Sequence, residues 1–79
     1  MFETPDLGLA ATLQCFGHNC CELNKEIPGR TAFKFEETPD LSTVENHYWQ
    51  GKLKVEPQAY YNHLKGLKNR LYSEKKKET

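Results

Sequence analysis

The residues best suited to metal or thiol chemistry lie together between positions 15 and 21. Cys15, Cys20 and Cys21 offer three thiols, and His18 offers an imidazole. Thiolates and imidazoles are the usual ligands of structural zinc, which normally takes four of them, often from paired knuckles of fixed spacing. Here a fourth ligand would have to come from a distant histidine, and two adjacent cysteines on a strand point to opposite faces. The spacing therefore favours inert, buried cysteines over a zinc or redox sensor, and both interpretations stay open.

The sequence contains no motif that arranges residues for catalysis. A cysteine nucleophile needs a base, a third group that orients the base, and an oxyanion site. Asp6 and Asp40 are explained as residues that start helices, and His18 follows a predicted helix, where it can bond the last carbonyl groups. We therefore expect a protein that is not an enzyme and has no cofactor.

The predicted last helix carries aromatic and basic residues that could bind a partner. Its apolar residues recur every three or four positions, at Tyr60, Leu64, Leu67 and Leu71. A turn of ~100° per residue places a second stripe beside them, formed by Tyr61, Lys65, Lys68 and Tyr72. This stripe could contact nucleic acid or a protein. Alternatively, both tyrosines could widen the buried face of the helix, with the lysine side chains lying over them. Further basic residues of this candidate surface are Lys52, Lys54 and Arg70.

Two other groups of residues could contact a protein partner. Trp49 lies one position beyond the apolar face of its predicted helix, so it either seals the core from the side or is an exposed anchor. The pattern favours sealing. Acidic residues around a predicted hairpin form a surface that could dock on a basic partner, namely Glu22, Glu26, Glu36 and Glu37.

Composition places the chain among small cytoplasmic domains. Its formal charge is zero, but residues 1–50 carry a net −5 and residues 51–79 a net +5. Neutrality argues against a general nucleic-acid binder, so we expect an unidentified protein partner, with nucleic acid as the alternative. No run approaches the ~20 apolar residues of a membrane span, and the start lacks the features of a secretion signal. Three cysteines, two of them adjacent, favour reduced thiols.

A five-residue repeat positions two of the predicted helices. Glu-Thr-Pro-Asp-Leu occurs at residues 3–7 and again at 37–41. Threonine is a good N-cap, proline fits the first helical position, and aspartate favours the positive end of the helix dipole. With Gly17 and Gly51 as stop signals, the repeat predicts helices over 5–16 and 39–50.

The remaining elements complete an α+β domain over residues 1–73. Residues 19–26 and 31–36 form a predicted hairpin around a type II turn at Ile27-Pro28-Gly29-Arg30. Thr31, Phe33 and Phe35 should face the core from the second strand, and Cys21 and Leu23 should face it from the first. Leu53 and Val55 predict a short edge strand or a plain connector, and an unpaired edge would suit a homodimer. The order is helix, hairpin, helix, optional strand and a helix from Pro57, with residues 74–79 as a solvated basic tail.

Several short motifs resemble a family of small bacterial and mobile-element proteins filed as a domain of unknown function. They are Thr4-x-Asp6-Leu7-x-Leu9-Ala10-Ala11, Gly17-His18, Phe33-x-Phe35, Tyr48-Trp49 before a glycine, Val55-x-Pro57, and Leu67-Lys68 with Leu71-Tyr72. The resemblance covers nearly the whole chain and implies the fold and the domain boundaries. It supplies no catalytic residues. It also implies a setting in bacteria, plasmids and phages, and with it a regulatory or inhibitory binding protein.

Overall fold

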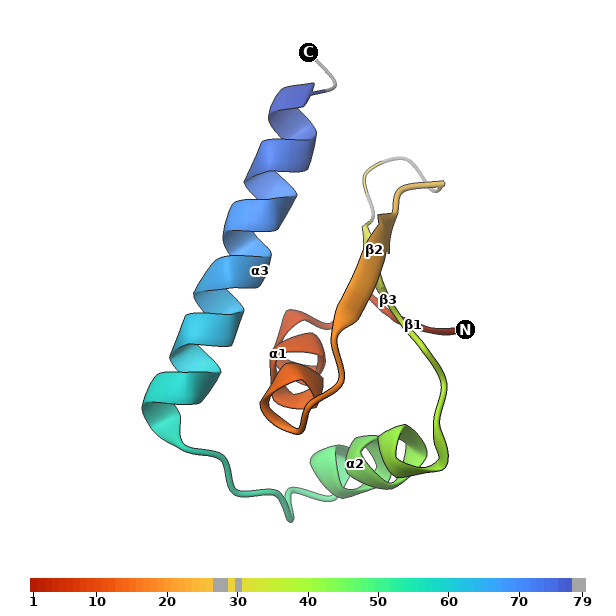
Figure 1. Ribbon diagram of the computed structural model, residues 1–79, viewed down its shortest axis with the longest axis vertical. Coiled ribbons are helices and arrows are strands. Elements are labelled where there is room, and N and C mark those ends of the chain that lie inside the picture. The colour runs from red at the N-terminus through yellow and green to blue at the C-terminus, as the bar shows by residue number, and fades with distance from the viewer. Residues whose placement is uncertain (27–28, 30, 78–79) are drawn as a thin grey trace.

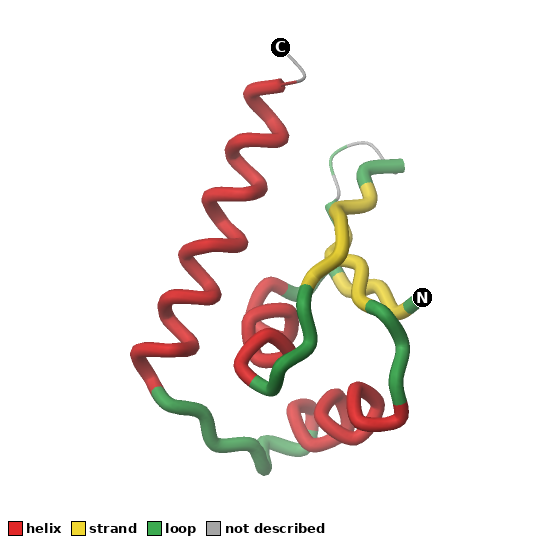
Figure 2. The backbone as a smooth tube through the Cα atoms, viewed as in Figure 1, coloured by secondary structure: helices red, strands yellow, loops and turns green. Residues whose placement is uncertain are grey.

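The computed structural model describes the backbone of residues 1–26, 29 and 31–77, with side chains up to Ser73. Its elements in chain order are β1 (Phe2–Thr4), α1 (Leu7–Cys15), β2 (Cys20–Asn24), β3 (Ala32–Phe35), α2 (Pro39–Trp49) and α3 (Pro57–Lys77). The predicted α+β class is confirmed. Helix α1 lies in the middle, between the sheet, α2 and the long α3 (Figures 1 and 2).

The sheet has three antiparallel strands in the order β1-β3-β2. Its third strand is not the predicted Leu53–Val55 segment, which lies in the connector between α2 and α3, but the N-terminal β1. Phe2 is opposite Phe35, and Thr4 is opposite Phe33. A three-residue strand leaves little periodic signal in a sequence, so only its pairing with β3 defines it.

The repeated pentapeptide has two different structures. At its second copy Thr38 is the N-cap of α2, and its hydroxyl accepts a hydrogen bond from the backbone of Leu41 at 3.2 Å. At the first copy the prediction of an N-cap at Thr4 is wrong: Thr4 is a buried strand residue, and Asp6 caps α1 by accepting from the backbone of Leu9 at 2.9 Å. Pairing with β3 holds Thr4 extended, so this helix starts at Leu7 rather than residue 5.

Strand β2 contains a bulge that reverses the expected orientation of its cysteines. Cys20 is opposite Phe35, but Glu22 rather than Cys21 is opposite Lys34, so one residue is inserted. Cys20 is consequently buried and Cys21 is exposed, which corrects the predicted inward position of Cys21. In the hairpin turn Gly29 has φ +77°, while Ile27, Pro28 and Arg30 lie outside the described residues.

The core forms where α1 meets the two phenylalanines of β3. Its largest fully buried side chains are Phe33, Phe35, Leu9, Leu13 and Leu41. Ala10 and Ala11 have no exposed surface, and their small side chains let neighbouring elements approach α1 closely. The predicted inward positions of Phe33 and Phe35 are thus confirmed.

Helix α3 covers α1 with the predicted apolar face. Leu67 is buried, and Tyr60, Leu64 and Leu71 are partly buried against the core. The helical backbone continues to Lys77, so α3 runs into the segment predicted to be a tail (Figure 1). None of the helices in the described part of the chain is long and apolar enough to cross a membrane.

Candidate functional site

The tyrosine and lysine stripe of α3 lies on the surface. Tyr61 is 59% exposed and Tyr72 is 62% exposed. Lys65 and Lys68 between them are exposed as well. The alternative of a widened core edge is therefore wrong, because the buried stripe of α3 already fills the contact with α1. We call these four residues the α3 face.

The α3 face is entirely cationic in its charge. Residues 57–73 contain no acidic residue, so no side chain of this part of α3 offsets Lys65 and Lys68. Lys52 and Lys54 are exposed in the connector that precedes the helix. The chemistry of this surface suits carboxylates or phosphates, with aromatic rings for apolar or stacking contacts.

Arg70 is held within the fold, on another side of α3. Its Nη1 donates to the carbonyl oxygen of Cys20 at 3.0 Å, and its Nη2 donates to that of Cys21 at 3.2 Å. Both terminal nitrogens of the guanidinium are thus hydrogen-bonded to backbone carbonyl oxygens at the bulge of β2. The structure does not bring Arg70 together with the α3 face.

Trp49 is an exposed aromatic residue at the end of α2. Its side chain is 60% exposed, so the favoured interpretation that it seals the core is wrong. The neighbouring Tyr48 takes the inward position instead, and the two rings meet edge to face with centroids 4.9 Å apart. This contact orients the indole while leaving most of it accessible.

The acidic surface around the hairpin is partly neutralised. Lys34 pairs with Glu22 at 2.8 Å. Through this hydrogen bond and charge, the pKa of Glu22 is lowered and the pKa of Lys34 is raised. The N-terminal ammonium lies 3.7 Å from Glu37. Glu26 and Glu36 are exposed and form no ion pair within the described residues.

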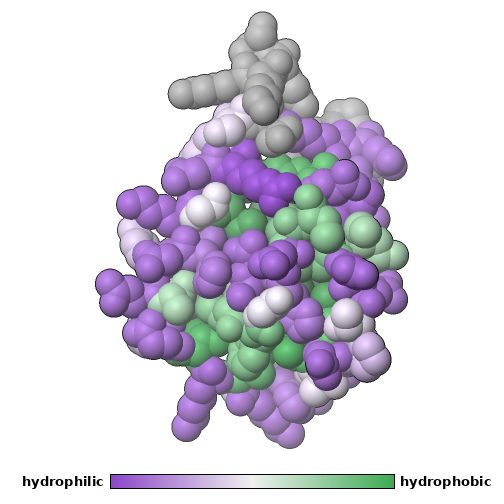
Figure 3. All heavy atoms as spheres, in the orientation of Figure 1, coloured by the Kyte–Doolittle hydropathy of each residue, from purple (hydrophilic) through white to green (hydrophobic). Residues whose placement is uncertain are grey.

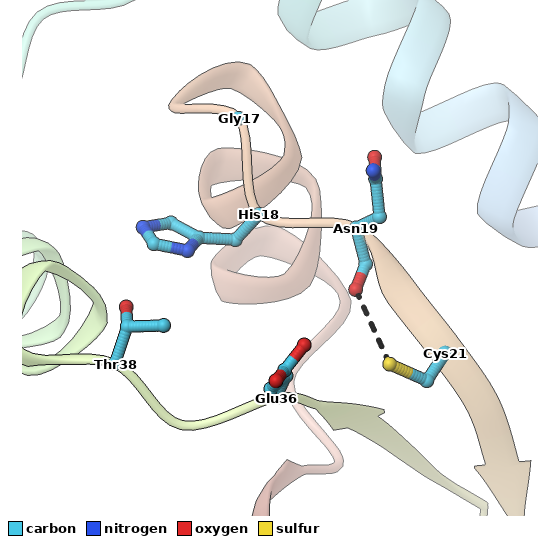
Figure 4. A pocket seen from close by; sticks show the side chains of 6 residues that line it. All are labelled: Gly17, His18, Asn19, Cys21, Glu36 and Thr38. Atoms are coloured by element: carbon cyan, nitrogen blue, oxygen red, sulfur yellow. Dashed lines mark hydrogen bonds between the residues drawn. The ribbon is translucent and has the colours of Figure 1, made fainter.

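A shallow pocket of about 240 Å³ lies where α1 turns into β2. It is lined by Gly17, His18, Asn19, Cys21, Glu36 and Thr38 (Figure 4). The His18 backbone N–H donates to the Leu13 carbonyl at 3.0 Å, so the backbone rather than the predicted imidazole caps α1. In Figure 4 the imidazole lies toward Thr38, and the Cys21 thiol lies on the other side, donating to the Asn19 carbonyl.

The three thiols are free and do not converge. Burial raises the pKa of Cys20, and burial together with the Glu56 charge raises the pKa of Cys15, so both are held as thiols. Cys21 is exposed on the far side of the bulge. Among the residues the structure describes, no three His, Cys, Asp or Glu side chains are placed to hold a metal ion. The grouping of Cys15, His18, Cys20 and Cys21 in sequence does not become a shared site.

A polar junction that was not predicted from the sequence joins the three helices. Tyr48 of α2 donates to Asp6 at 3.5 Å, beside Gly8 of α1. Tyr60 of α3 approaches the same glycine. Burial, the Asp6 charge and the nearby Tyr60 raise the pKa of Tyr48. The glycine inside an alanine-rich helix was the available signal, because such a residue often marks close packing.

The sequence also matches a known family. The match is to the family described as domain of unknown function DUF5659, and it extends over residues 1–73. It therefore includes every element except the last turn of α3. No curated protein and no solved structure matches the chain. The motifs, the fold and the extent of the match agree, and the chain belongs to the DUF5659 family of domains of unknown function.

Proposed function

We propose that this protein is a small binding module whose partner is another protein, with Trp49 as an anchor of the contact. The observation that carries the proposal is the 60% exposure of the indole. Tryptophan is enriched among the residues that dominate binding energy at interfaces. Because Tyr48 supports the ring edge to face, the indole is ordered before binding and loses little conformational freedom.

The α3 face supports the same proposal by its chemistry. Tyr61 and Tyr72 offer large, rigid contact surfaces, and Lys65 and Lys68 between them suit an acidic partner. The acidic hairpin surface is the weaker docking site, since Glu22 and Glu37 already have cationic neighbours. We expect the exchange of Glu36 and Glu37 for lysine to leave binding intact, whereas Lys65→Glu with Lys68→Glu weakens it.

Nucleic-acid binding is the second candidate function. It is favoured by the absence of acidic residues from 57–73 and by the two exposed tyrosines, which lie ~16 Å apart along α3. Fluorescence anisotropy with labelled DNA and RNA at two salt concentrations tests it, since phosphate contacts weaken steeply as salt rises. Binding that weakens with salt, and that is lost when Lys65→Glu and Lys68→Glu are combined, would identify a nucleic acid rather than a protein as the partner.

The wider setting is part of the proposal. We place this binding role in the cytoplasm, as expected from the sequence pattern, and in bacteria and hosts of mobile elements, the setting that the family resemblance implies. The role proposed is non-catalytic and needs no cofactor. Zinc or redox sensing through the cysteines is the weakest alternative, and elemental analysis of protein purified without chelator tests its zinc form.

Site-specific photo-crosslinking tests the protein-binding proposal. A photoreactive phenylalanine analogue is placed at Trp49 in one variant and at Ser42 in the other, and both are expressed in the native host. Both positions are on α2 and exposed, so they differ in the proposed contact alone. We expect a defined crosslinked protein from position 49 and none from position 42. The proposal fails if position 49 gives no product, or if both positions give the same products.

A further inference from the structure

The connector between α2 and α3 has the surface pattern of a strand but no partner strand. From Lys52 to Glu56 the side chains alternate between exposed and half-buried, with Leu53 and Val55 turned toward the protein. The backbone groups of Leu53, Lys54 and Val55 have no hydrogen-bond partner among the described residues. The segment runs along the outside of the molecule (Figure 1). Unpaired backbone groups of this kind are a template for another strand.

The two edges of this segment differ in how many backbone N–H and C=O groups lack a hydrogen-bond partner among the described residues. In a strand, residues 53 and 55 present their N–H and C=O groups on one edge, and residues 52, 54 and 56 present theirs on the other. The second edge is partly used, because Lys52 N–H donates to His47 and the Glu56 carbonyl accepts from Tyr60. On the first edge none of the four groups of Leu53 and Val55 has a hydrogen-bond partner within the part of the chain that the structure describes.

The edges of the sheet itself are less available. Arg70 occupies the carbonyl oxygens of Cys20 and Cys21 on β2, and β1 at the other edge has three residues. Short or covered edges are two of the devices by which proteins prevent strand addition, and lysine or proline at an edge is another. Among the described residues no side chain bonds the backbone of Leu53, Lys54 or Val55, so Lys52, Lys54 and Pro57 are the features of the connector that a partner strand must accommodate.

The sequence of the connector is complementary to itself in the antiparallel direction. With Lys54 at a two-fold axis, Leu53 lies opposite Val55 of a second copy, and these two pairs can exchange four backbone hydrogen bonds. Lys52 of each copy then lies opposite Glu56 of the other, which makes two such pairs. The Glu56 carboxylate is already held in place, because its Oε2 accepts from the backbone of Ala59 at 2.6 Å. The one unfavourable pair is Lys54 with Lys54 of the second copy, because both side chains are positively charged.

We propose that residues 52–56 pair antiparallel with the same residues of a second copy and form a two-stranded, symmetric dimer contact. The two direct Lys52 and Glu56 pairs outweigh the single Lys54 pair, and apolar Leu53 and Val55 meet across the strands. Figure 3 shows apolar side chains at the surface over α1 and the first half of α3, close to this segment, which a second copy would partly cover. The contact needs no residue of the α3 face and does not depend on the protein partner proposed above.

Two substitutions of opposite effect test the contact in the intact chain by analytical ultracentrifugation. Lys52→Glu places two glutamates opposite two glutamates, and we expect the dimer dissociation constant to rise about tenfold or more. Lys54→Thr removes the central repulsion and adds a β-branched residue, so the dissociation constant should fall. Lys65→Glu makes the same charge change as Lys52→Glu on α3 and should leave dimerisation unchanged.

Amide hydrogen exchange gives a second readout that a dimer formed elsewhere would not produce. In the proposed register the amides of Leu53 and Val55 become slower to exchange as protein concentration rises, while that of Lys54 stays fast. The proposal is overturned by a wild-type protein that remains monomeric at the highest attainable concentration. It is equally overturned by a dimer that ignores Lys52→Glu or lacks this alternating protection.

Discussion

Arg70 donates a hydrogen bond from Nη1 to the carbonyl oxygen of Cys20 at 3.0 Å, which ties α3 to the edge strand β2 across fifty positions of sequence. The second arm reaches the carbonyl of Cys21 at 3.2 Å. The bulge makes this geometry available, because it inserts a residue between Cys20 and Glu22. The cation that looked like a free binding residue in the sequence instead holds the hairpin against the last helix.

Replacing Arg70 should therefore lower the free energy of unfolding. Arg70→Met keeps the aliphatic stem but removes both charged donors, and we expect a loss of about 1–3 kcal/mol. Urea unfolding followed by circular dichroism measures it. Lys68→Met is the matched control, since Lys68 is exposed on the same helix. Equal stability of the two variants would show that the Arg70 contact contributes nothing.

The glycines of α1 and α3 should respond in opposite ways to alanine. A methyl group on Gly8 would lie 2.7 Å from the Tyr48 hydroxyl and 3.2 Å from that of Tyr60, whereas one on Gly66 meets nothing within 4 Å. Gly66→Ala should stabilise by about 0.5–1 kcal/mol through helix propensity. Gly8→Ala should lose that gain and destabilise, because the polar junction must shift. Thermal unfolding of the Gly8→Ala and Gly66→Ala variants measures both effects. A Gly8→Ala variant more stable than the wild type would contradict the packing described.

The Glu22 and Lys34 pair predicts a small loss of stability in acid. Because the folded pKa of Glu22 is lowered, its contribution is present above the pKa of the unfolded chain and disappears as pH falls through the folded value. NMR titration of the carboxyl carbon should show Glu22 titrating at lower pH in the wild type than in Lys34→Met. High salt should reduce the difference, since both groups are on the surface. Coincident curves at low salt would rule out the pair.

Exposure of Trp49 predicts that its removal affects binding more than folding. Trp49→Ala should change the free energy of unfolding little, because the side chain is 60% exposed. Leu41→Ala on the same helix removes a side chain that is 1% exposed and should cost about 2–5 kcal/mol. Denaturant unfolding of both variants provides the comparison. A Trp49→Ala cost near that of Leu41→Ala would mean that the indole is part of the core.

The sequence determined the parts of the fold that depend on local signals. Thr38, Pro39 and Gly51 set the bounds of α2, and the spacing of Leu64, Leu67 and Leu71 identified the buried face of α3. These signals work because capping and helical periodicity involve residues a few positions apart.

The parts that the sequence did not predict depend on distant pairing. Strand β1 exists because Phe2 and Thr4 pair with residues about thirty positions away, and that pairing also makes Asp6 the cap in place of Thr4. The bulge that exposes Cys21 is set by the register with Lys34. On α2 the apolar pattern placed Tyr48 inward correctly, but it did not decide whether Trp49, one position beyond that face, seals the core or stays exposed.

The proposed protein contact depends above all on the Trp49 indole. Isothermal titration of the partner captured at position 49 measures this dependence, with the wild-type protein, Trp49→Ala and, as the control for the acidic surface, Glu26→Gln. We predict that Trp49→Ala weakens binding by a factor of about thirty or more, equivalent to roughly 2 kcal/mol, and that Glu26→Gln binds like the wild type. Unchanged affinity of Trp49→Ala would contradict the claim.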